Sequence, residues 1–370
     1  GEGYFIAADI GTTTLVMEKR KKSDGRVEAV YKEINAQRIF GADVLTRMEA
    51  SLSGKGEELS QKITEQLEKG ITQLCADGEK ADFMVIAANT TMVHLLMKYS
   101  VERLGRAPFI PETLDEIVTE IGGIKTYIMP GFSAFVGGDI KAGLYTLSFL
   151  RETDKNLIEN KEKSGKWNLF IDLGTNAELV LFCENRGICC ATAAGPAFEG
   201  GANRGIWGAD MVKLLQKLLG EGLMDRQGLL KEPYFTRGIR IGDVLVTKEA
   251  VRAVQLAKGA IAAGIEILTE SYGIRLSDIS KVVLAGGFGY YLDPKAAAAI
   301  GLLPKELTDR TVTGGNTALS GAALVGNRIL TGQLRSWDDL HRRQELQIQI
   351  LNLAEQIKFA ETFLKKMDFC

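Results

Sequence analysis

The stretch that decides the fold is DIGTTT at residues 9–14, which returns in altered form as DLGTN at residues 172–176. Each copy follows a short apolar run, at 4–9 or 167–172, and precedes another, at 15–19 or 177–183. This pattern predicts a bend between two antiparallel strands. Two copies so far apart in the sequence indicate two homologous lobes rather than a solenoid of short repeats.

Glycine in such a bend lets backbone N–H groups converge on a small volume that suits phosphate oxygens. The acid that ends each strand, Asp9 or Asp172, can hold Mg²⁺ through water, and the ion then neutralises the phosphates. One such string alone is typical of a plain β-turn, but two in matching context favour a nucleoside triphosphate held from both sides. The predicted phosphate contacts are Gly11, Thr12, Thr13, Thr14, Gly174, Thr175 and Asn176.

Two further glycine-rich strings follow apolar runs in the second half of the chain. AGGFG at 285–289 lets a flat ring approach the backbone, so it predicts an adenosine-binding loop at Gly286, Gly287 and Phe288. An ordinary strand-to-helix turn is the alternative. GGNTA at 314–318 opens a helix of small residues, and we expect Asn316 to contact the nucleotide.

Two more carboxylates are candidates for catalysis. Asp139 follows FVGG at a predicted helix start, where it could activate the attacking water; the alternative is an acid that only complements the helix dipole. Glu199 and Gly200 lie in GPAFEGG at 195–201, which either closes over the phosphates or packs the lobes together. The two histidines, His94 and His341, are expected to be structural or exposed.

Apolar spacing predicts helices over 57–74 and 248–272, and a further helix runs from 314–318 to 330. We expect strands at 83–88 and 126–129, with a helix N-cap among Asn89, Thr90 and Thr91 between them. The charged run 151–166 is expected to cross between the lobes. This organisation predicts a first lobe at 1–165, onto which 316–370 packs back, and a second lobe at 166–315.

Composition narrows the class of protein. The chain has 370 residues, 45% of them hydrophobic, and a net charge of -2, so neither a nucleic acid nor a membrane surface is expected as partner. It lacks an apolar run long enough to span a membrane. The five cysteines form no C-x-x-C pair, and we expect Cys189 and Cys190 to be buried in a strand, in a protein of the reducing cytoplasm.

Together the motifs resemble the superfamily of actin, sugar kinases and heat-shock chaperone ATPases. DIGTTT and DLGTN are similar to its two phosphate motifs, 284–289 to its adenosine motif, and 135–143 and 315–326 to its connecting helices. The resemblance implies an α/β fold of two lobes, each a mixed five-stranded-type sheet flanked by helices. The nucleotide is expected in the cleft between the lobes.

Longer strings resemble one branch, the ATP-dependent reductive activators of corrinoid proteins in anaerobes. They are FGADV at 40–44, ANTTM at 88–92, AAGPAFEG at 193–200, QLAKGAI at 255–261 and the run 284–294. This resemblance implies an ATP hydrolase, with Mg²⁺, that drives cobalt(II) to cobalt(I) on a corrinoid protein, and a homodimer. The family's iron–sulfur cluster is expected on a separate protein or on a missing upstream domain, since the chain begins at Gly1.

Three alternatives stay open. A small-molecule kinase of this fold would use Asp139 on a substrate that faces the γ-phosphate. An actin-like assembly module would polymerise with nucleotide and turn it over slowly. A dehydratase activator would hold a cluster between two subunits through loop cysteines, whereas Cys183, Cys189 and Cys190 lie in strand-like sequence.

Overall fold

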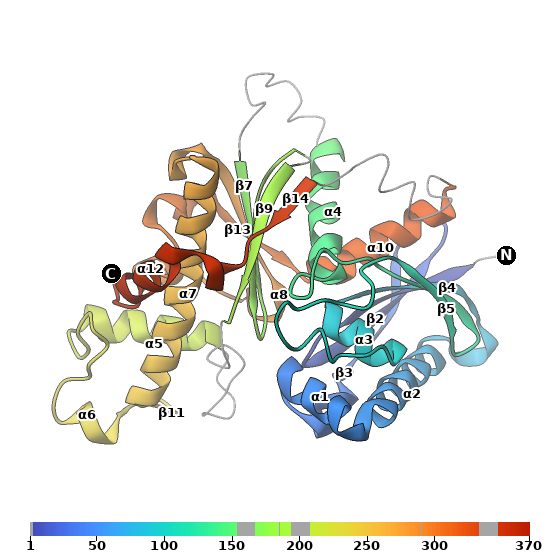
Figure 1. The fold of residues 1–370 in the computed structure, drawn as a ribbon, viewed down its shortest axis with the longest axis horizontal. Helices are drawn as coiled ribbons and strands as arrows, with labels where there is room; N and C mark the ends of the chain where they lie inside the picture. The colour runs from blue at the N-terminus through green and yellow to red at the C-terminus, as the bar shows by residue number, and fades with distance from the viewer. Residues whose placement is uncertain (1–2, 154–166, 185, 194–207, 290, 333–346) are drawn as a thin grey trace. The chain divides into compact units, whose positions relative to one another are not determined.

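The computed structural model describes residues 3–153, 167–184, 186–193, 208–289, 291–332 and 347–370. By its contacts the chain divides into two compact units, one of residues 1–160 with 317–345 and one of 161–316 with 346–370. Each unit is built on a six-stranded mixed sheet with helices packed against it (Figure 1). The predicted α/β class is confirmed, with six strands in each sheet rather than five. None of the described helices is both long and apolar enough to cross a membrane.

The sheet of the first unit has the strand order β3-β2-β1-β4-β6-β5. β1, β4 and β6 run parallel, while β2, β3 and β5 pair antiparallel with their neighbours. The carboxyl ends of β1 and β4 therefore lie beside each other at one edge of the sheet. The strands are β1 (Tyr4–Ile10), β2 (Thr14–Lys21), β3 (Val27–Ile34), β4 (Ala81–Ala88), β5 (Ile117–Ile121) and β6 (Ile124–Ile128).

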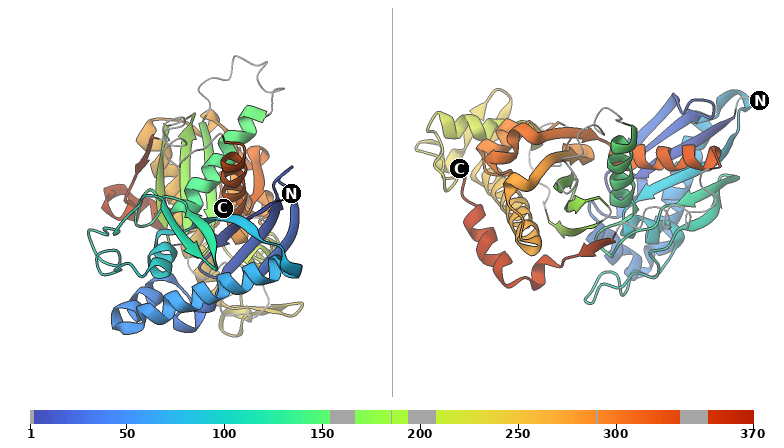
Figure 2. Two further views of the ribbon diagram at one scale, coloured as in Figure 1. Left: turned by 90° about the vertical axis from the view of Figure 1, so that its right-hand side faces the viewer. Right: turned by 90° about the horizontal axis from the view of Figure 1, so that it is seen from above.

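Helices cover both faces of this sheet, because successive side chains along each strand point to opposite faces. Ile6, Ala8 and Ile10 point into a core with the apolar stripe of α2, whereas Phe5 meets Gly326 of α10 on the other face. α10 also lies alongside α4 (Figures 1 and 2). The helical segments of this unit are η1 (Ala36–Phe40), α1 (Val44–Ala50), η2 (Ser51–Lys55), α2 (Gly56–Leu74), η3 (Ala76–Gly78), α3 (Thr90–Met97), α4 (Gly138–Thr153) and α10 (Thr317–Leu330).

The sheet of the second unit has the order β13-β12-β7-β8-β9-β14. β7, β12 and β13 are parallel, and β8 is antiparallel to both β7 and β9. The three parallel strands β7, β12 and β13 thus end at the same edge, as β1, β4 and β6 do in the first unit. The strands are β7 (Trp167–Leu173), β8 (Ala177–Cys183), β9 (Arg186–Thr192), β12 (Ile279–Ala285), β13 (Thr311–Gly315) and β14 (Gln347–Ile350), with a separate hairpin of β10 (Ile239–Ile241) and β11 (Val244–Val246).

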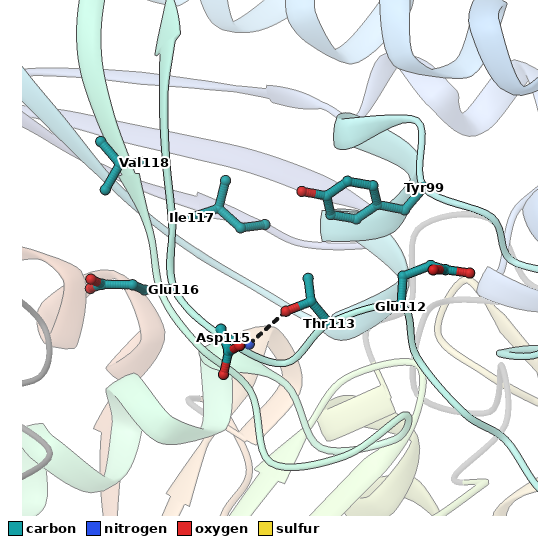
Figure 3. Close-up of a pocket in the computed structure, with 7 residues that line it drawn as sticks. All are labelled: Tyr99, Glu112, Thr113, Asp115, Glu116, Ile117 and Val118. Atoms are coloured by element: carbon teal, nitrogen blue, oxygen red, sulfur yellow. Dashed lines mark hydrogen bonds between the residues drawn. The ribbon is translucent and has the colours of Figure 1, made fainter.

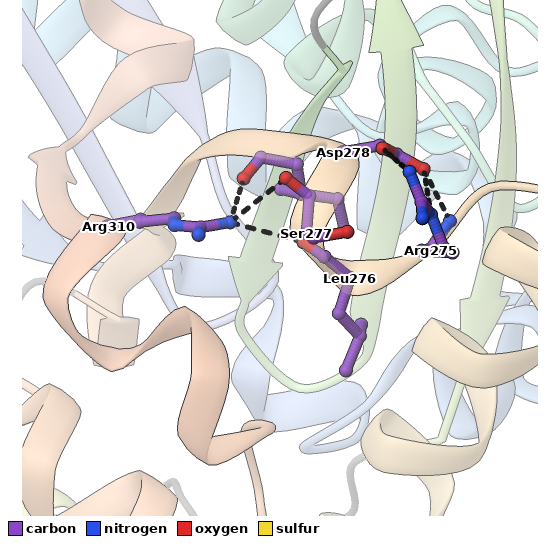
Figure 4. Close-up of polar contacts among 6 residues, drawn as sticks. Arg275, Leu276, Ser277, Asp278 and Arg310 are labelled. Carbon is purple, nitrogen blue, oxygen red and sulfur yellow. Dashed lines mark hydrogen bonds and ion pairs between the residues drawn. The ribbon is translucent and has the colours of Figure 1, made fainter.

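The long helix α7 packs on β8 and β9. The guanidinium of Arg310 donates to the carbonyl oxygens of Leu276, Ser277 and Ile279, which fixes the start of β12 (Figure 4). Cys189 and Cys190 are buried in β9 as predicted. The helical segments are α5 (Gly208–Gly220), α6 (Tyr234–Arg237), α7 (Lys248–Tyr272), η7 (Leu276–Asp278), α8 (Gly286–Gly289), α9 (Pro294–Ala299), η8 (Lys305–Arg310), η9 (Leu353–Glu355) and α12 (Ile357–Lys366).

The end of the chain differs from the sequence-based expectation. We expected all of 316–370 to pack on the first lobe, and α10 does lie in the first unit. β14, however, pairs in parallel with β9, and α12 packs against α7, so residues 347–370 belong to the second unit (Figure 2). Polar and apolar residues alternate along β14, which is typical of a strand, but such a pattern does not identify the partner strand.

Candidate functional site

The first predicted phosphate turn lies between β1 and β2. Ile10 pairs with Leu15, so four residues form the turn, and the N–H of Gly11 donates to the carbonyl oxygen of Thr14 at 2.9 Å. A Cβ on Gly11 would lie 2.8 Å from that same oxygen, which explains the glycine. Asp9 stands at the end of β1, opposite Val16 in the ladder. The turn is therefore tight, and the acid is fixed by a strand that is paired on both sides.

Two residues that sequence analysis did not single out hold the backbone of this turn. Three successive carbonyl oxygens, those of residues 11 to 13, each accept a hydrogen bond from Asn35 or Arg47. The donors are Asn35 Nδ2 to Gly11 at 2.8 Å, Arg47 Nη2 to Thr12 at 2.6 Å, and Asn35 N to Thr13 at 2.8 Å. Both side chains are buried with 0% exposure. A signal existed for Arg47, since it follows closely on the FGADV string at 40–44.

Asn89 joins the end of β4 to the same turn. Its side-chain oxygen accepts from the N–H of Met92 at 2.9 Å, which caps α3 as predicted, and its amide donates to Thr12 Oγ1 at 3.1 Å. A Cβ on Gly137 would lie 2.6 Å from Asn89 Cα, so only glycine allows the start of α4 to approach this closely. Asp139, in the first turn of α4, is thereby brought to the edge of the sheet that carries the turn.

Asp139 has an unusual protonation equilibrium. Desolvation raises the pKa of its carboxyl group to about 6, and a hydrogen bond from the N–H of Ile140 at 2.9 Å opposes this rise. A carboxylate whose pKa lies close to neutrality can accept a proton from water more readily than an ordinary aspartate. These properties suit a general base, although the same position also suits a helix dipole.

In the second unit, strand register brings three predicted motifs together. Asp172 of β7 pairs with Ala285 of β12, and Ala285 pairs with Gly315 of β13. The second phosphate turn, the predicted adenosine loop and Asn316 therefore start from adjacent positions at one edge of the sheet. The turn itself has three residues between the paired Leu173 and Ala177, and the N–H of Gly174 donates to the carbonyl oxygen of Asn176 at 2.9 Å.

The predicted adenosine loop packs directly on this turn. Gly286 has a φ of 85°, and a Cβ there would lie 2.6 Å from Asp172 Oδ1 and 2.5 Å from the carbonyl oxygen of Leu173. A Cβ on Gly287 would meet nothing within 4 Å, so this glycine faces open space. The side chain of Phe288 is 4% exposed and belongs to the core, which leaves only its backbone as a nucleotide contact.

The remaining residues singled out from the sequence are Glu199, Gly200 and the two histidines. Glu199 and Gly200 lie outside the described residues, as does His341. His94 is buried and structural: its Nδ1 lies 2.8 Å from the carbonyl oxygen of Thr90, and its Nε2 accepts from the N–H of Glu112 at 2.9 Å. These contacts favour the neutral ring, and desolvation lowers the pKa of His94.

The side chains of the described residues fit an iron–sulfur cluster and a magnesium ion differently. Across the described ranges, no three His, Cys, Asp or Glu side chains gather into a group that could hold a metal ion, so an iron–sulfur cluster does not fit these residues. Mg²⁺ needs less, because it keeps most of its water and takes one or two carboxylates together with substrate phosphates. Asp9 and Asp172, each at a strand end beside a glycine turn, fit that requirement.

A separate pocket of about 500 Å³ lies in the first unit and is lined by none of the predicted site residues (Figure 3). The residues that line it are Tyr99, Glu112, Thr113, Asp115, Glu116, Ile117 and Val118. His94 links this pocket to α3 through the N–H of Glu112. Its acidic lining, with Glu112, Asp115 and Glu116, does not suit phosphate.

Two mixed sheets of matching central order, each with an acid-tipped glycine turn, define the actin-like α/β class that includes sugar kinases and chaperone ATPases. Within that class, residues 4–152 match the family model described as the RACo middle region. Residues 166–204 and 202–370 match the C-terminal domain of RACo, the ASKHA domain. The chain thus belongs to the RACo family of reductive activators of corrinoid proteins, which confirms the family predicted from its sequence.

Known relatives agree with this assignment. The chain is 31% identical to the corrinoid activation enzyme RamQ of Eubacterium limosum, over 99% of this chain and 70% of that protein. It is 21% identical to the Co(II) methylated amine-specific corrinoid protein reductase of Methanosarcina barkeri, over 86% and 68%. A solved reductive activator for corrinoid, iron-sulfur protein superposes with a TM-score of 0.82 at 26% identity, over 99% and 66%. The chain spans about two thirds of the length of these proteins.

Proposed function

We propose that this chain is the ATP-hydrolysing part of a reductive activator that returns a corrinoid methyl-transfer protein from cobalt(II) to cobalt(I). One observation carries the proposal: each sheet has a central strand whose next-to-last residue is an aspartate, Asp9 or Asp172, and a tight glycine turn follows it. Membership in the RACo family supplies the corrinoid protein as the partner class. The proposal places one nucleotide between the two turns.

Each predicted residue then has a role. The N–H groups of residues 12–14 and 175–176 bind phosphate oxygens, while those of Gly11 and Gly174 close their turns. Asp9 and Asp172 hold Mg²⁺ through water, and the ion supplies charge neutralisation when bound. Gly286, Gly287, the backbone of Phe288, and Asn316 hold the adenosine, because glycine allows a ring to approach the backbone. Asp139 orients and deprotonates the attacking water. The proposal keeps Glu199 as a further catalytic carboxylate and Gly200 as a phosphate contact, both outside the described residues.

The redox step needs one electron, which the cobalt(II) centre of the partner accepts to become cobalt(I). The described residues hold no ligands for a cluster, so we assign the electron to an iron–sulfur donor elsewhere in a longer chain or on another protein. ATP binding closes the nucleotide site, and this change alters the contact with the corrinoid protein. A ligand can drive such a change only through its better fit to the closed state.

ATP turnover by the chain, with and without corrinoid proteins of the source organism, tests the proposal. We expect one of these proteins to stimulate hydrolysis, and we expect cobalt(I) formation, followed by its absorption spectrum, to require ATP and an iron–sulfur donor. Turnover that responds to sugars or short acids but to no corrinoid protein would instead support a small-molecule kinase. Nucleotide-dependent polymerisation with slow turnover would support an assembly module.

The homodimer implied by the family is a separate point. Light scattering of the purified chain measures it directly, with and without MgATP. A monomer under both conditions would remove the dimer from the proposal without affecting the nucleotide site.

A further inference from the structure

Arg47 is a fully buried arginine beneath the first turn, with 0% of its surface exposed. Besides the Thr12 carbonyl oxygen, its guanidinium reaches the carbonyl oxygen of Gly41 through Nε at 2.9 Å and Met92 Sδ through Nη1 at 3.6 Å. Burying a guanidinium is costly unless its donors are satisfied. The fold therefore directs a strong, geometrically rigid set of donors at the backbone of the turn.

The local sequence explains how Arg47 arrives there. Gly41 has a φ of 151°, and a Cβ on it would lie 2.5 Å from Thr46 Cβ, so only glycine permits the chain to fold back onto α1. Asp43 then caps α1 by accepting a hydrogen bond from the N–H of Thr46 at 2.8 Å. A hydrogen bond from the Thr46 hydroxyl, together with this one, lowers the pKa of Asp43. The FGADV string at 40–44 thus builds the start of the helix that carries Arg47.

Because the peptide bond is planar, the hydrogen bond from Arg47 to the Thr12 carbonyl also sets the direction of the neighbouring N–H group. In a trans peptide, the C=O of one residue and the N–H of the next point in opposite directions. Arg47 holds the Thr12 carbonyl, so the N–H of Thr13 is directed away from the guanidinium. Asn35 holds the Gly11 carbonyl, so the N–H of Thr12 is directed away from Asn35 in the same manner.

We propose that Arg47 is a positioning residue for a polyphosphate: it holds the first turn in the orientation that presents the N–H group of Thr13. The inference rests on the proposed nucleotide site, and it concerns only the phosphate part of the ligand. Adenosine has no phosphate, so its binding should not depend on Arg47. This difference separates a positioning role from a merely structural one.

The test compares R47M, R47K and the control R20M in the full chain. Arg20 is a matched control because it also donates to a backbone carbonyl, that of Gly25 at 2.9 Å, but at the β2–β3 hairpin of the first unit. Titration calorimetry with MgATP and with adenosine gives both affinities, and urea unfolding without ligand gives the stability of each variant.

We expect R47M to weaken MgATP binding about 30-fold and to leave adenosine binding within about twofold, since a hydrogen bond to a charged group is lost. R47K keeps the charge and one donor, so a loss of about fivefold is expected. R20M should bind both ligands as the wild type does. If R47M does not fold, the loss of MgATP affinity in R47K tests the positioning role of Arg47 instead.

Wild-type MgATP affinity in the Arg47 variants, or an equal loss for ATP and adenosine, would overturn the inference while leaving the proposed function intact. A wild-type chain that does not bind MgATP at all would overturn the proposed function and this inference with it.

Discussion

The turn after β1 places four residues between the paired Ile10 and Leu15, whereas the turn after β7 places three between Leu173 and Ala177. Side chains from other segments hold the first turn, while the backbone of the adenosine loop packs closely on the second, at Gly286. The two repeats therefore keep the acid and the glycine but differ in loop length and in support. Similar sequence strings can thus respond differently to substitution.

Asp139 is expected to have the largest effect, and it belongs to the first unit alone. If it is the general base, D139N should lower ATP turnover about 1000-fold, within the usual range for such a group. Wild-type turnover should fall as the pH drops through about 6, where the carboxylate takes up a proton. Steady-state rates between pH 5 and 8 measure both effects.

D139N should lower ATP turnover but raise the stability of the folded chain. Because the pKa of Asp139 is raised in the folded state, the folded chain binds more protons than the unfolded chain between the ordinary pKa of aspartate and about 6. Its contribution to stability is present at acid pH and is lost as the pH rises through this window. We expect D139N to melt at a higher temperature than the wild type at pH 7, and a lower melting temperature would speak against desolvation as the cause.

Gly286 and Gly287 test the support of the second turn. G286A should destabilise the chain by about 3 kcal/mol, because it combines a positive φ with a close backbone contact. G287A is the control, since its Cβ would meet nothing within 4 Å, and a change below about 0.5 kcal/mol is expected. Urea unfolding gives both values. Equal effects would mean that the adenosine loop does not pack on the second turn as described.

Gly11 and Gly174 compare the two turns directly. A Cβ on Gly11 would lie 2.8 Å from a backbone oxygen, whereas at Gly174 the nearest atom would be at 3.8 Å. G11A should therefore cost about 2 kcal/mol of stability and G174A only a few tenths. The same unfolding measurement checks the pair, and a G174A variant that is the less stable of the two would reverse the comparison.

Asn89 separates helix capping from support of the first turn, and its effect should be smaller than those of Asp139, Gly286 and Gly11. N89A removes both the cap of α3 and the donor to Thr12, so a loss of about 1 kcal/mol and a modest loss of ATP affinity are expected. T247A removes a comparable cap from α7, where Thr247 Oγ1 accepts at 3.2 Å, and should cost stability alone. An equal loss of ATP affinity in both variants would contradict a role for Asn89 at the turn.

The sequence allowed much of the fold to be predicted where the signal was local. Periodicity gave α2 and α7 almost to the residue, and the strings around Asp9 and Asp172 gave both strand–turn–strand units. β14 could not be placed, because its partner β9 is remote in the chain. β5 was not predicted, although it had a local signal: Gly122 and Gly123 form the positive-φ turn of the β5–β6 hairpin.

The candidate site was predictable only in its outer residues. Acids and glycines at strand ends are recognisable as candidates by residue type and position, which is why Asp9, Gly11 and Gly286 could be named. The residues beneath them were not named, because Asn35 and Arg47 act through backbone carbonyls that any sequence provides, and the FGADV string before Arg47 marks only the segment. The glycine string predicted a loop at Phe288 but not that its side chain packs in the core, because that burial depends on remote segments.

The most direct test of the central claim is a double-mutant cycle on MgATP affinity with D9N, D172N and the double variant. If both acids hold one metal on one nucleotide, calorimetry of the wild type should give one ATP per chain. Each single variant should lose about 30-fold in affinity, and the double variant hardly more, because the first substitution already releases the ion. Fully additive losses, or a wild-type affinity in either single variant, would contradict a shared magnesium–nucleotide site.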